Sequence, residues 1–116
     1  MYYLSTCSTC KKIIKELELS EEVILQDLKS EPLTKDQLED LKQRAGSYEA
    51  LFSKHAQLYK SKGLKDRNLS EADFKNYLLE HYTFLKRPVL IYNGQIFIGN
   101  SKTTVEAAKT FIHTHE

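Results

Sequence analysis

Short apolar runs alternate with longer amphipathic stretches along this chain, and each pattern predicts one kind of element. Residues 1–4 are strand-like, and the apolar run at residues 23–28 is too short for a helix. It therefore predicts a second strand, parallel to the first. Between them, residues 11–19 repeat apolar side chains at helical spacing and predict a helix. The chain is expected to begin as a β-α-β unit.

The middle of the chain is predicted to be helical. Residues 34–37 (Thr-Lys-Asp-Gln) are typical of a capping box, and the helix that follows should end near Gly46. Residues 47–65 have only weak periodicity and predict short helical turns. Ser70 predicts the start of another helix, which should run to about His81.

The strongest β pattern lies near the C-terminal end. Residues 89–92 and 95–98 are β-rich runs joined by Asn93-Gly94, a dipeptide typical of a type I′ turn, so they predict an antiparallel hairpin. Thr103 and Glu106 then predict a capping box for a last helix. The predicted order is β-α-β, helices, β-β-α.

This order predicts an α/β, thioredoxin-like fold, with a mixed four-stranded sheet flanked by helices. A helical insertion at about residues 34–82 would separate the β-α-β half from the β-β-α half. A chain of 116 residues is of ordinary size for one domain, so residues 1–116 are expected to form a single domain.

The charge balance gives little reason to expect a charged macromolecular partner. With 17 basic and 16 acidic residues the formal net charge is +1, so direct binding of nucleic acid or of a membrane is not expected. No charged leader or long apolar segment precedes the first predicted strand, which favours a cytoplasmic location. In that compartment a cysteine pair is more often catalytic or redox-sensing than a structural disulfide.

The chain has two cysteines, Cys7 and Cys10, which lie between the first predicted strand and the first predicted helix. Backbone N–H groups at a helix start are unsatisfied and carry partial positive charge, so they stabilise a thiolate. Lys11 and Lys12 add two cations, and such surroundings lower a cysteine pKa from about 8.5 to between about 3.5 and 7.5. We therefore predict that Cys7 attacks as the nucleophile and that Cys10, inside the first turn, resolves the mixed disulfide.

Two other roles for the cysteine pair stay open. The pair could supply half of a zinc site, but zinc needs four ligands and no second Cys-x-x-Cys is present. His113 and His115 lie near the C-terminal end, at a spacing unlike the usual zinc-finger pattern. Alternatively, both cysteines are small buried residues without reactivity.

Three motifs resemble the family of ArsC-type arsenate reductases and Spx-type redox regulators, which share this fold and its insertion. They are residues 7–12 at the start of the first helix, residues 30–34 at the start of the insertion, and residues 80–81 followed by residues 85–91. The resemblance implies that Arg87 lies beside the reactive cysteine, where it contacts an oxyanion or steadies the thiolate, and that Pro88 follows a cis peptide bond. Without the resemblance, Arg87 is simply a solvated charge ahead of a buried strand.

The resemblance to arsenate reductases is incomplete where the anion binds. Those enzymes use several arginines, and of those positions only Arg87 is an arginine here. At the other arginine positions, this chain has Lys11 four residues after Cys7 and Ser53-Lys54 in the insertion. After the last strand it has Gly99-Asn100. Lysine keeps the charge but loses the planar fork that binds an oxyanion, and asparagine keeps neither. These departures argue against arsenate as the substrate and leave Lys11, Arg87 and Pro88 as supports of the cysteine site.

The internal second cysteine, Cys10, is similar to the Spx branch, whose members use a dithiol as a redox switch while they bind the RNA polymerase alpha subunit. This chain lacks the basic C-terminal tail common in that branch, and no arginine stands near Gln95 at the hairpin turn. The resemblance to this branch is therefore also partial.

The sequence predicts a small cytoplasmic thiol-disulfide oxidoreductase in which Cys7 attacks a disulfide or oxidised substrate and Cys10 displaces the product. No bound cofactor is expected, and thioredoxin or glutathione would restore the dithiol as the external reductant. The alternative function is an Spx-like transcriptional regulator that binds the RNA polymerase alpha subunit according to its redox state. A third interpretation is an inactive relative whose cysteines are incidental.

Overall fold

The computed structural model describes residues 1–64 and 67–114, apart from the side chains of residues 57 and 58. The chain divides into two compact units. Unit 1 joins Met1–Glu31 to the chain from Arg87 onward, and unit 2 is Pro32–Lys86. The helices expected as an insertion lie in unit 2, while the expectation of a single domain stays a prediction.

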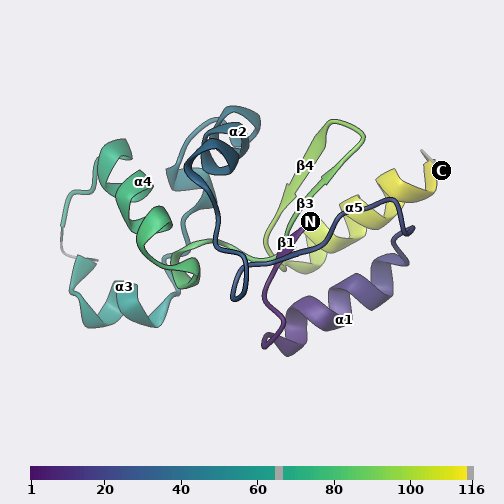
Figure 1. The fold of residues 1–116 in the computed structure, drawn as a ribbon, viewed down its shortest axis with the longest axis horizontal. Coiled ribbons are helices and arrows are strands. Elements are labelled where there is room, and N and C mark those ends of the chain that lie inside the picture. The colour runs from purple at the N-terminus through teal and green to yellow at the C-terminus, as the bar shows by residue number, and fades with distance from the viewer. Residues whose placement is uncertain (65–66, 115–116) are drawn as a thin grey trace. The chain divides into compact units, whose positions relative to one another are not determined.

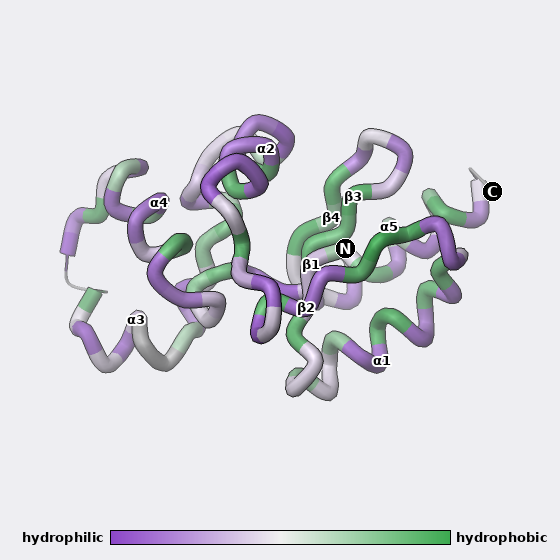
Figure 2. Tube along the Cα trace, viewed as in Figure 1, coloured by the Kyte–Doolittle hydropathy of each residue, from purple (hydrophilic) through white to green (hydrophobic). Residues whose placement is uncertain are grey.

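Unit 1 is built on a four-stranded sheet with the order β2-β1-β3-β4. Figure 1 labels β1, β3 and β4 of this sheet, and Figure 2 labels β2 as well. Strand β1 (Tyr2–Tyr3) pairs in parallel with β2 (Gln26–Asp27) and antiparallel with β3 (Val89–Tyr92). Strand β3 pairs with β4 (Gln95–Ile98) as an antiparallel hairpin. The mixed sheet, the parallel return of the second strand and the hairpin are therefore confirmed.

Two helices of unit 1, α1 (Ser8–Leu17) and α5 (Lys102–Thr114), pack against each other and share a buried cluster with β3 (Figure 1). Hydrophobic and polar residues alternate along the turns of α1, as the colours in Figure 2 show. Burying the apolar face contributes about 25 cal/mol per Å² and stabilises a helix too short to be stable alone. The buried cluster consists of Met1, Ile13, Leu17, Leu90, Val105, Ala108 and Ile112.

The turn of the hairpin has the backbone that its sequence predicts. Asn93 and Gly94 have φ angles of 49° and 83°, and a type I′ turn needs positive φ at both positions. Asparagine and glycine tolerate this conformation better than other residues do. Tyr92 and Gln95 face each other directly across the turn, so the register of the two strands follows from it.

The bounds of α1 and β2 differ from those predicted from the sequence. Helix α1 runs from Ser8 to Leu17 rather than over residues 11–19, so Cys10 is itself helical. Strand β2 covers only two residues of the expected run 23–28, because β1 offers only two residues for pairing. The apolar stretch ahead of β2, green in Figure 2, is therefore not a buried strand, and Ile24 within it is 83% exposed.

The expected start of the last helix was wrong. Thr103 does not cap α5 with Glu106, because Thr103 already lies inside the helix, which begins at Lys102. The hydroxyl of Ser101 instead accepts the N–H of Thr104 at 3.2 Å, so the serine takes the capping role.

Unit 2 consists of helices and turns. Its described elements are α2 (Lys35–Ala45), the 3-10 helix η1 (Glu49–Leu51), α3 (Gln57–Ser61), α4 (Glu71–Glu80) and the 3-10 helix η3 (Tyr82–Phe84). Capping boxes begin α2 and α4, in which Thr34 with Gln37 and Ser70 with Asp73 exchange hydrogen bonds of 2.9 to 3.3 Å. Helix α2 ends at Gly46, which has a φ of 100°. These helix starts and this helix end are confirmed.

Aromatic rings pack together among the buried leucines of unit 2. Phe52 is 1% exposed, and its ring stacks on that of Phe84 with centroids 5.3 Å apart. The ring of Phe74 lies 4.9 Å from that of Phe52 in a tilted arrangement. The short helices expected at residues 47–65 are present up to residue 64, and residue 65 lies outside the described residues.

The helices of both units are short. Helix α5 has 13 residues and α2 has 11, while α1 and α4 have 10 each. Within residues 1–64 and 67–114, none is long and apolar enough to cross a membrane.

Candidate active site

Cys7 stands at the N-cap of α1, shortly after strand β1. Its backbone is extended, with φ −93° and ψ 109°, and its N–H donates to the carbonyl oxygen of Leu4 at 3.0 Å, which closes a tight turn. Its own carbonyl oxygen accepts the N–H of Lys11 at 3.2 Å as the first hydrogen bond of the helix. The side chain of Cys7 is partly exposed, so a substrate can reach the sulfur.

The surroundings of Cys7 favour its thiolate. Burial by itself would raise the pKa, but hydrogen bonds from the backbone and side chain of Cys10 and from the backbone of Thr9, with the charge of Arg87, hold the pKa below its ordinary value. The N–H contacts fall outside the standard geometry of a side-chain helix cap. They still stabilise the thiolate because the attraction between a charge and the helix N-terminus extends through the first turn. Cys7 is therefore suited to nucleophilic attack.

Cys10 has the opposite properties. It lies in the first turn of α1 and is only 1% exposed. Burial raises the pKa of its thiol to about 11, and the hydrogen bond to Cys7 and the charge of Cys7 contribute to the rise. Both cysteines are free in the structure, and the side chain of Cys10 forms a hydrogen bond with that of Cys7. The alternative that both cysteines are buried packing residues does not fit the partly exposed Cys7.

Arg87 and Pro88 come directly before strand β3. The Arg87–Pro88 peptide bond is cis. Pro88 is buried, and its carbonyl oxygen accepts the N–H of Gly99 at 2.9 Å, which ties it to the end of β4. Arg87 is partly exposed, and its charge contributes to the lowered pKa of Cys7 and opposes the larger rise in the pKa of Cys10. Arg87 therefore favours the thiolate form of both cysteines through its charge.

The other positions considered for anion binding have different surroundings. Lys11 is exposed on α1, and its supporting role stays a prediction. Lys54, in unit 2, forms an ion pair with Glu49 at a distance of 3.1 Å between Nζ and Oε2. Asn100 is exposed and carries no charge. Arg87 is thus the cation whose effect on the cysteines the structure supports.

One residue near the cysteines was not singled out from the sequence. Asp27 ends β2, and its Oδ1 accepts the N–H of Ser5, two residues before Cys7, at 3.0 Å. Parallel strands end at the same edge of a sheet, so the pairing of β1 with β2 was the signal that could have revealed this neighbour. In the predicted strand at residues 23–28, Asp27 was treated as an ordinary strand residue.

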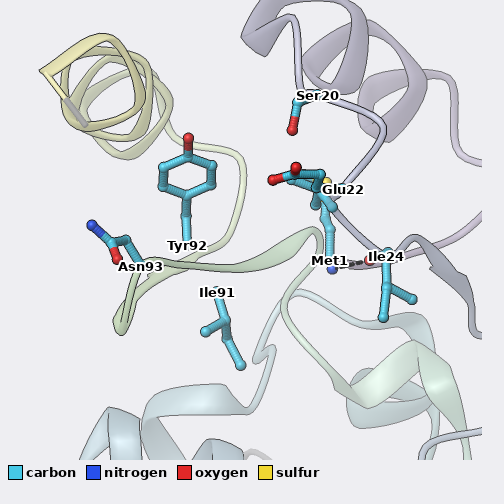
Figure 3. Close-up of a pocket in the computed structure, with 8 residues that line it drawn as sticks. Met1, Ser20, Glu22, Ile24, Ile91, Tyr92 and Asn93 are labelled. Atoms are coloured by element: carbon cyan, nitrogen blue, oxygen red, sulfur yellow. Dashed lines mark hydrogen bonds between the residues drawn. The ribbon is translucent and has the colours of Figure 1, made fainter. Parts of the chain in front are cut away.

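A hollow in unit 1, drawn in Figure 3, is a separate feature. The connection between α1 and β2 contributes Ser20 and Glu22 to its lining, and the hairpin contributes Tyr92. At its base the Met1 ammonium donates to the carbonyl oxygen of Ile24 at 2.6 Å, and burial lowers the pKa of that ammonium. Neither cysteine lines this hollow, so it does not house the candidate chemistry.

Metal ligation was one of the two alternatives for the cysteine pair. Within residues 1–64 and 67–114, no three His, Cys, Asp or Glu side chains are grouped so that they could hold a metal ion. His113 lies in the last turn of α5. His115, the other histidine considered for a zinc site, lies outside the described residues.

Comparisons with known proteins place this site in context. The model of the ArsC family matches residues 2–108. No curated protein matches the chain. Among solved structures, an arsenate reductase from Vibrio cholerae is 26% identical with a TM-score of 0.69, covering 92% of this chain and 93% of that chain. The solution structure of an arsenate reductase (ArsC) related protein from Brucella melitensis is 23% identical with a TM-score of 0.70, covering 91% of this chain and 89% of that chain.

Proposed function

Because the chain belongs to the ArsC family, we propose that it is a thiol-disulfide oxidoreductase in which Cys7 is the attacking thiol and Cys10 the resolving thiol. The observation that carries the proposal is the placement of two free cysteines within one helical turn, with Cys7 partly exposed at the N-cap and Cys10 buried. The pKa values of the two thiols shift in opposite directions there. Family membership and the likeness to arsenate reductases support a thiol-based oxidoreductase in general.

The first step forms a mixed disulfide. The Cys7 thiolate attacks one sulfur of a substrate disulfide, so a Cys7–substrate S–S bond forms while the substrate S–S bond breaks. The second substrate sulfur leaves as a thiolate and takes a proton from solvent. Arg87 favours this step because its charge increases the thiolate fraction of Cys7.

The second step requires Cys10 to lose its proton. Burial raises its pKa, and in the resting site the Cys7 thiolate raises it further through a hydrogen bond and through charge. In the mixed disulfide Cys7 is uncharged, so both contributions of Cys7 vanish and the pKa of Cys10 falls. The Cys10 thiolate then attacks the Cys7 sulfur, which forms the Cys7–Cys10 disulfide and releases the remaining half of the substrate as a thiolate. Two electrons have then passed from the dithiol to the substrate.

The cycle needs an external reductant, because the two steps leave the protein oxidised. We assign this role to thioredoxin or glutathione, which reduce disulfides in the cytoplasm. No bound cofactor enters the cycle, because both electrons come from the cysteine sulfurs. A cytoplasmic location fits a dithiol that must start reduced.

Arsenate is not the substrate that the site favours. A tetrahedral oxyanion is held best by planar, bidentate arginines, and the cation that acts on Cys7 is Arg87. Lys54 is already paired with Glu49, so its charge is partly neutralised. A disulfide needs no such arginine cluster, because its exchange moves a single negative charge from the attacking sulfur to the leaving sulfur and binds no oxyanion.

The test follows the covalent intermediates by intact mass after the reduced protein is mixed with excess oxidised glutathione. The wild type is expected to reach the Cys7–Cys10 disulfide with both halves of the glutathione disulfide released. Cys10→Ser is expected to stop at the mixed disulfide, and Cys7→Ser to remain unmodified. Ser8→Ala, which changes an exposed residue between them, serves as the matched control and should behave as the wild type. The proposal fails if Cys7→Ser reacts as fast as the wild type.

The same dithiol would also suit the alternative function, a redox-switched regulator that binds the RNA polymerase alpha subunit. The specific observation in its favour is that Cys10 sits within reach of Cys7 as an internal second thiol. The reduction potential separates the two functions. We expect a value near that of thioredoxin, about −270 mV, whereas a value above about −220 mV would keep the dithiol reduced until oxidative stress and would favour the switch.

A further inference from the structure

The carboxylate of Asp27 has no part in the steps above, although it lies beside the turn that carries Cys7. Its Oδ1 accepts two backbone N–H groups, from Ser5 at 3.0 Å and from Lys29 at 3.2 Å. The side chain of Ser5 also forms a hydrogen bond with this carboxylate. Ser5 and Asp27 are 22 residues apart in the chain, so this contact joins two separate segments.

The sheet explains why these segments meet. Strands β1 and β2 run in parallel, and the N–H of Leu28 donates to the carbonyl oxygen of Tyr3 at 2.9 Å. The residues that follow β1 therefore leave the sheet beside the end of β2. Asp27 stands at that end and reaches the first residue beyond Leu4.

The turn that Asp27 holds is short and leads directly into the active cysteine. Its backbone closure is the hydrogen bond from Cys7 N–H to Leu4 O, with Ser5 and Thr6 at the centre. A tight turn with one closing bond retains conformational freedom unless a side chain fixes it as well. The bonds from Ser5 to Asp27 supply that additional restraint.

Asp27 is itself held from the other side. Its carbonyl oxygen accepts the N–H of Ser30 at 3.2 Å and the N–H of Glu31 at 2.8 Å, which fold the chain back after β2. Its carboxylate is therefore attached to a backbone that is fixed by the sheet on one side and by this turn on the other.

We propose that Asp27 is a positioning residue for Cys7, because it holds the Ser5–Thr6 turn so that the N–H groups of Thr9 and Cys10 are directed at the Cys7 sulfur. This inference deepens the proposed function and rests on it. Asp27 is not a catalytic residue, since its oxygen contacts Ser5 and Lys29 and acts on the sulfur through the turn.

Hydrogen bonding to the side chain and backbone of Ser5 lowers the pKa of Asp27, so the carboxylate is ionised at neutral pH. The charged group that acts on Cys7 is Arg87, whereas Cys10 acts on it through hydrogen bonds, and Lys29 faces Asp27. If the charge of Asp27 acted directly on Cys7, replacing Asp27 would change the pKa of Cys7 in the opposite direction from the change that positioning predicts. A nearby negative charge raises a thiol pKa, so its removal would lower the pKa of Cys7.

The experiment measures the rate of iodoacetamide alkylation of Cys7 against pH, with the site confirmed by peptide mass, for the wild type, Asp27→Ala and Asp27→Asn. Asparagine keeps an oxygen that can accept from Ser5, whereas alanine does not. Ser70→Ala, which removes the cap of α4 in unit 2, is the control for a general loss of stability. Asp27→Ser, which is too short to bridge to Ser5 but can still cap the Lys29 N–H, replaces the alanine variant if that variant does not fold.

The positioning role predicts that Asp27→Ala raises the midpoint of the Cys7 titration by about half to one pKa unit. At a pH well below the wild-type midpoint, where the thiolate fraction falls in proportion, alkylation should slow by about three- to tenfold. Asp27→Asn and Ser70→Ala should keep the wild-type midpoint. The inference is overturned if Asp27→Ala leaves the midpoint unchanged, if both Asp27 variants lower it, or if Ser70→Ala raises it equally.

The glutathione reaction of the same proteins separates this inference from the function on which it rests. If the wild type forms the Cys7–Cys10 disulfide and Asp27→Ala has an unchanged midpoint, only the positioning inference fails. If the wild type has no lowered midpoint and forms no disulfide, the proposed function fails and the positioning inference falls with it.

Discussion

At the scale of single residues, the difference between Cys7 and Cys10 arises from where one helical turn places them. Cys7 precedes the turn, so its sulfur meets N–H groups that no carbonyl accepts, while Cys10 lies within the turn and faces the buried side. Arg87 then adds a full charge to these partial charges. The helix start and the arginine act in the same direction, and their separate contributions can be measured by removing the arginine.

Replacing Arg87 is expected to raise the pKa of Cys7, because its charge favours the thiolate. Arg87 is partly exposed, so the effect of Arg87→Ala should be about half a pKa unit, as for a charge pair worth up to about 1 kcal/mol. At a given pH below the pKa of Cys7, the Arg87→Ala variant therefore has a smaller fraction of Cys7 thiolate than the wild type. The ultraviolet absorbance of the thiolate, followed against pH, measures the shift. Arg87→Lys keeps the charge and is the control, and equal pKa values in all three proteins would contradict the assignment.

The residues of the site differ in how far the sequence could predict them. Cys7 and Cys10 are local signals, because their spacing before an amphipathic stretch already places them at a helix start. The approach of Arg87 to the cysteines came from the family resemblance, since 80 residues of chain separate it from Cys7 and no spacing rule connects them. Asp27 was missed because its contact with Ser5 depends on the register of two parallel strands.

At the scale of elements, boundaries set by bonds between near neighbours were predicted well. The capping box of α2 and the Asn93-Gly94 turn each need only a few consecutive residues, and both are confirmed. The predicted start of α5 was wrong because Ser101 and Thr103 are both acceptable N-cap residues. The chain uses Ser101, which comes first after β4. Strand β2 was overextended because its length depends on its partner β1.

The capping box of α2 offers a test at this scale. Thr34→Ala removes the hydroxyl that accepts the N–H of Gln37 at 3.1 Å. The free energy of unfolding should fall by about 1 kcal/mol, the usual cost of losing an N-cap. Urea denaturation measures the change, and Thr34→Ser, which keeps the hydroxyl, should retain most of the stability. A loss of the same size in both variants would mean that the methyl group, not the hydrogen bond, stabilises this helix.

At the scale of the whole molecule, the residues proposed for chemistry all belong to unit 1. Cys7, Cys10 and Asp27 lie before Pro32, and Arg87 is the first residue after unit 2. The order of elements alone led to the thioredoxin-like fold, because a β-α-β start and a β-β-α end leave few ways to build one sheet. The net charge of +1 adds a second property of the whole chain, since it provides no long-range attraction for a charged substrate.

The dependence of the Cys7 reaction rate on salt concentration should therefore reflect only the charges near Cys7. Between about 0.01 M and about 1 M salt the Debye length falls from about 30 Å to about 3 Å, which screens a partly exposed cation. The reaction of Cys7 with anionic oxidised glutathione should slow several-fold over this range, because Arg87 attracts the substrate as well as the thiolate.

A neutral disulfide, such as hydroxyethyl disulfide, separates attraction of the substrate from stabilisation of the thiolate. Salt weakens the stabilisation of the Cys7 thiolate by Arg87, and this slows the reaction with both reagents. Only the anionic reagent also loses its attraction to Arg87, so the neutral reagent should slow less. In Arg87→Gln the difference between the two reagents should shrink, because the local cation is gone. If salt slows both reagents equally in the wild type, Arg87 acts on the thiolate alone and does not recruit the substrate.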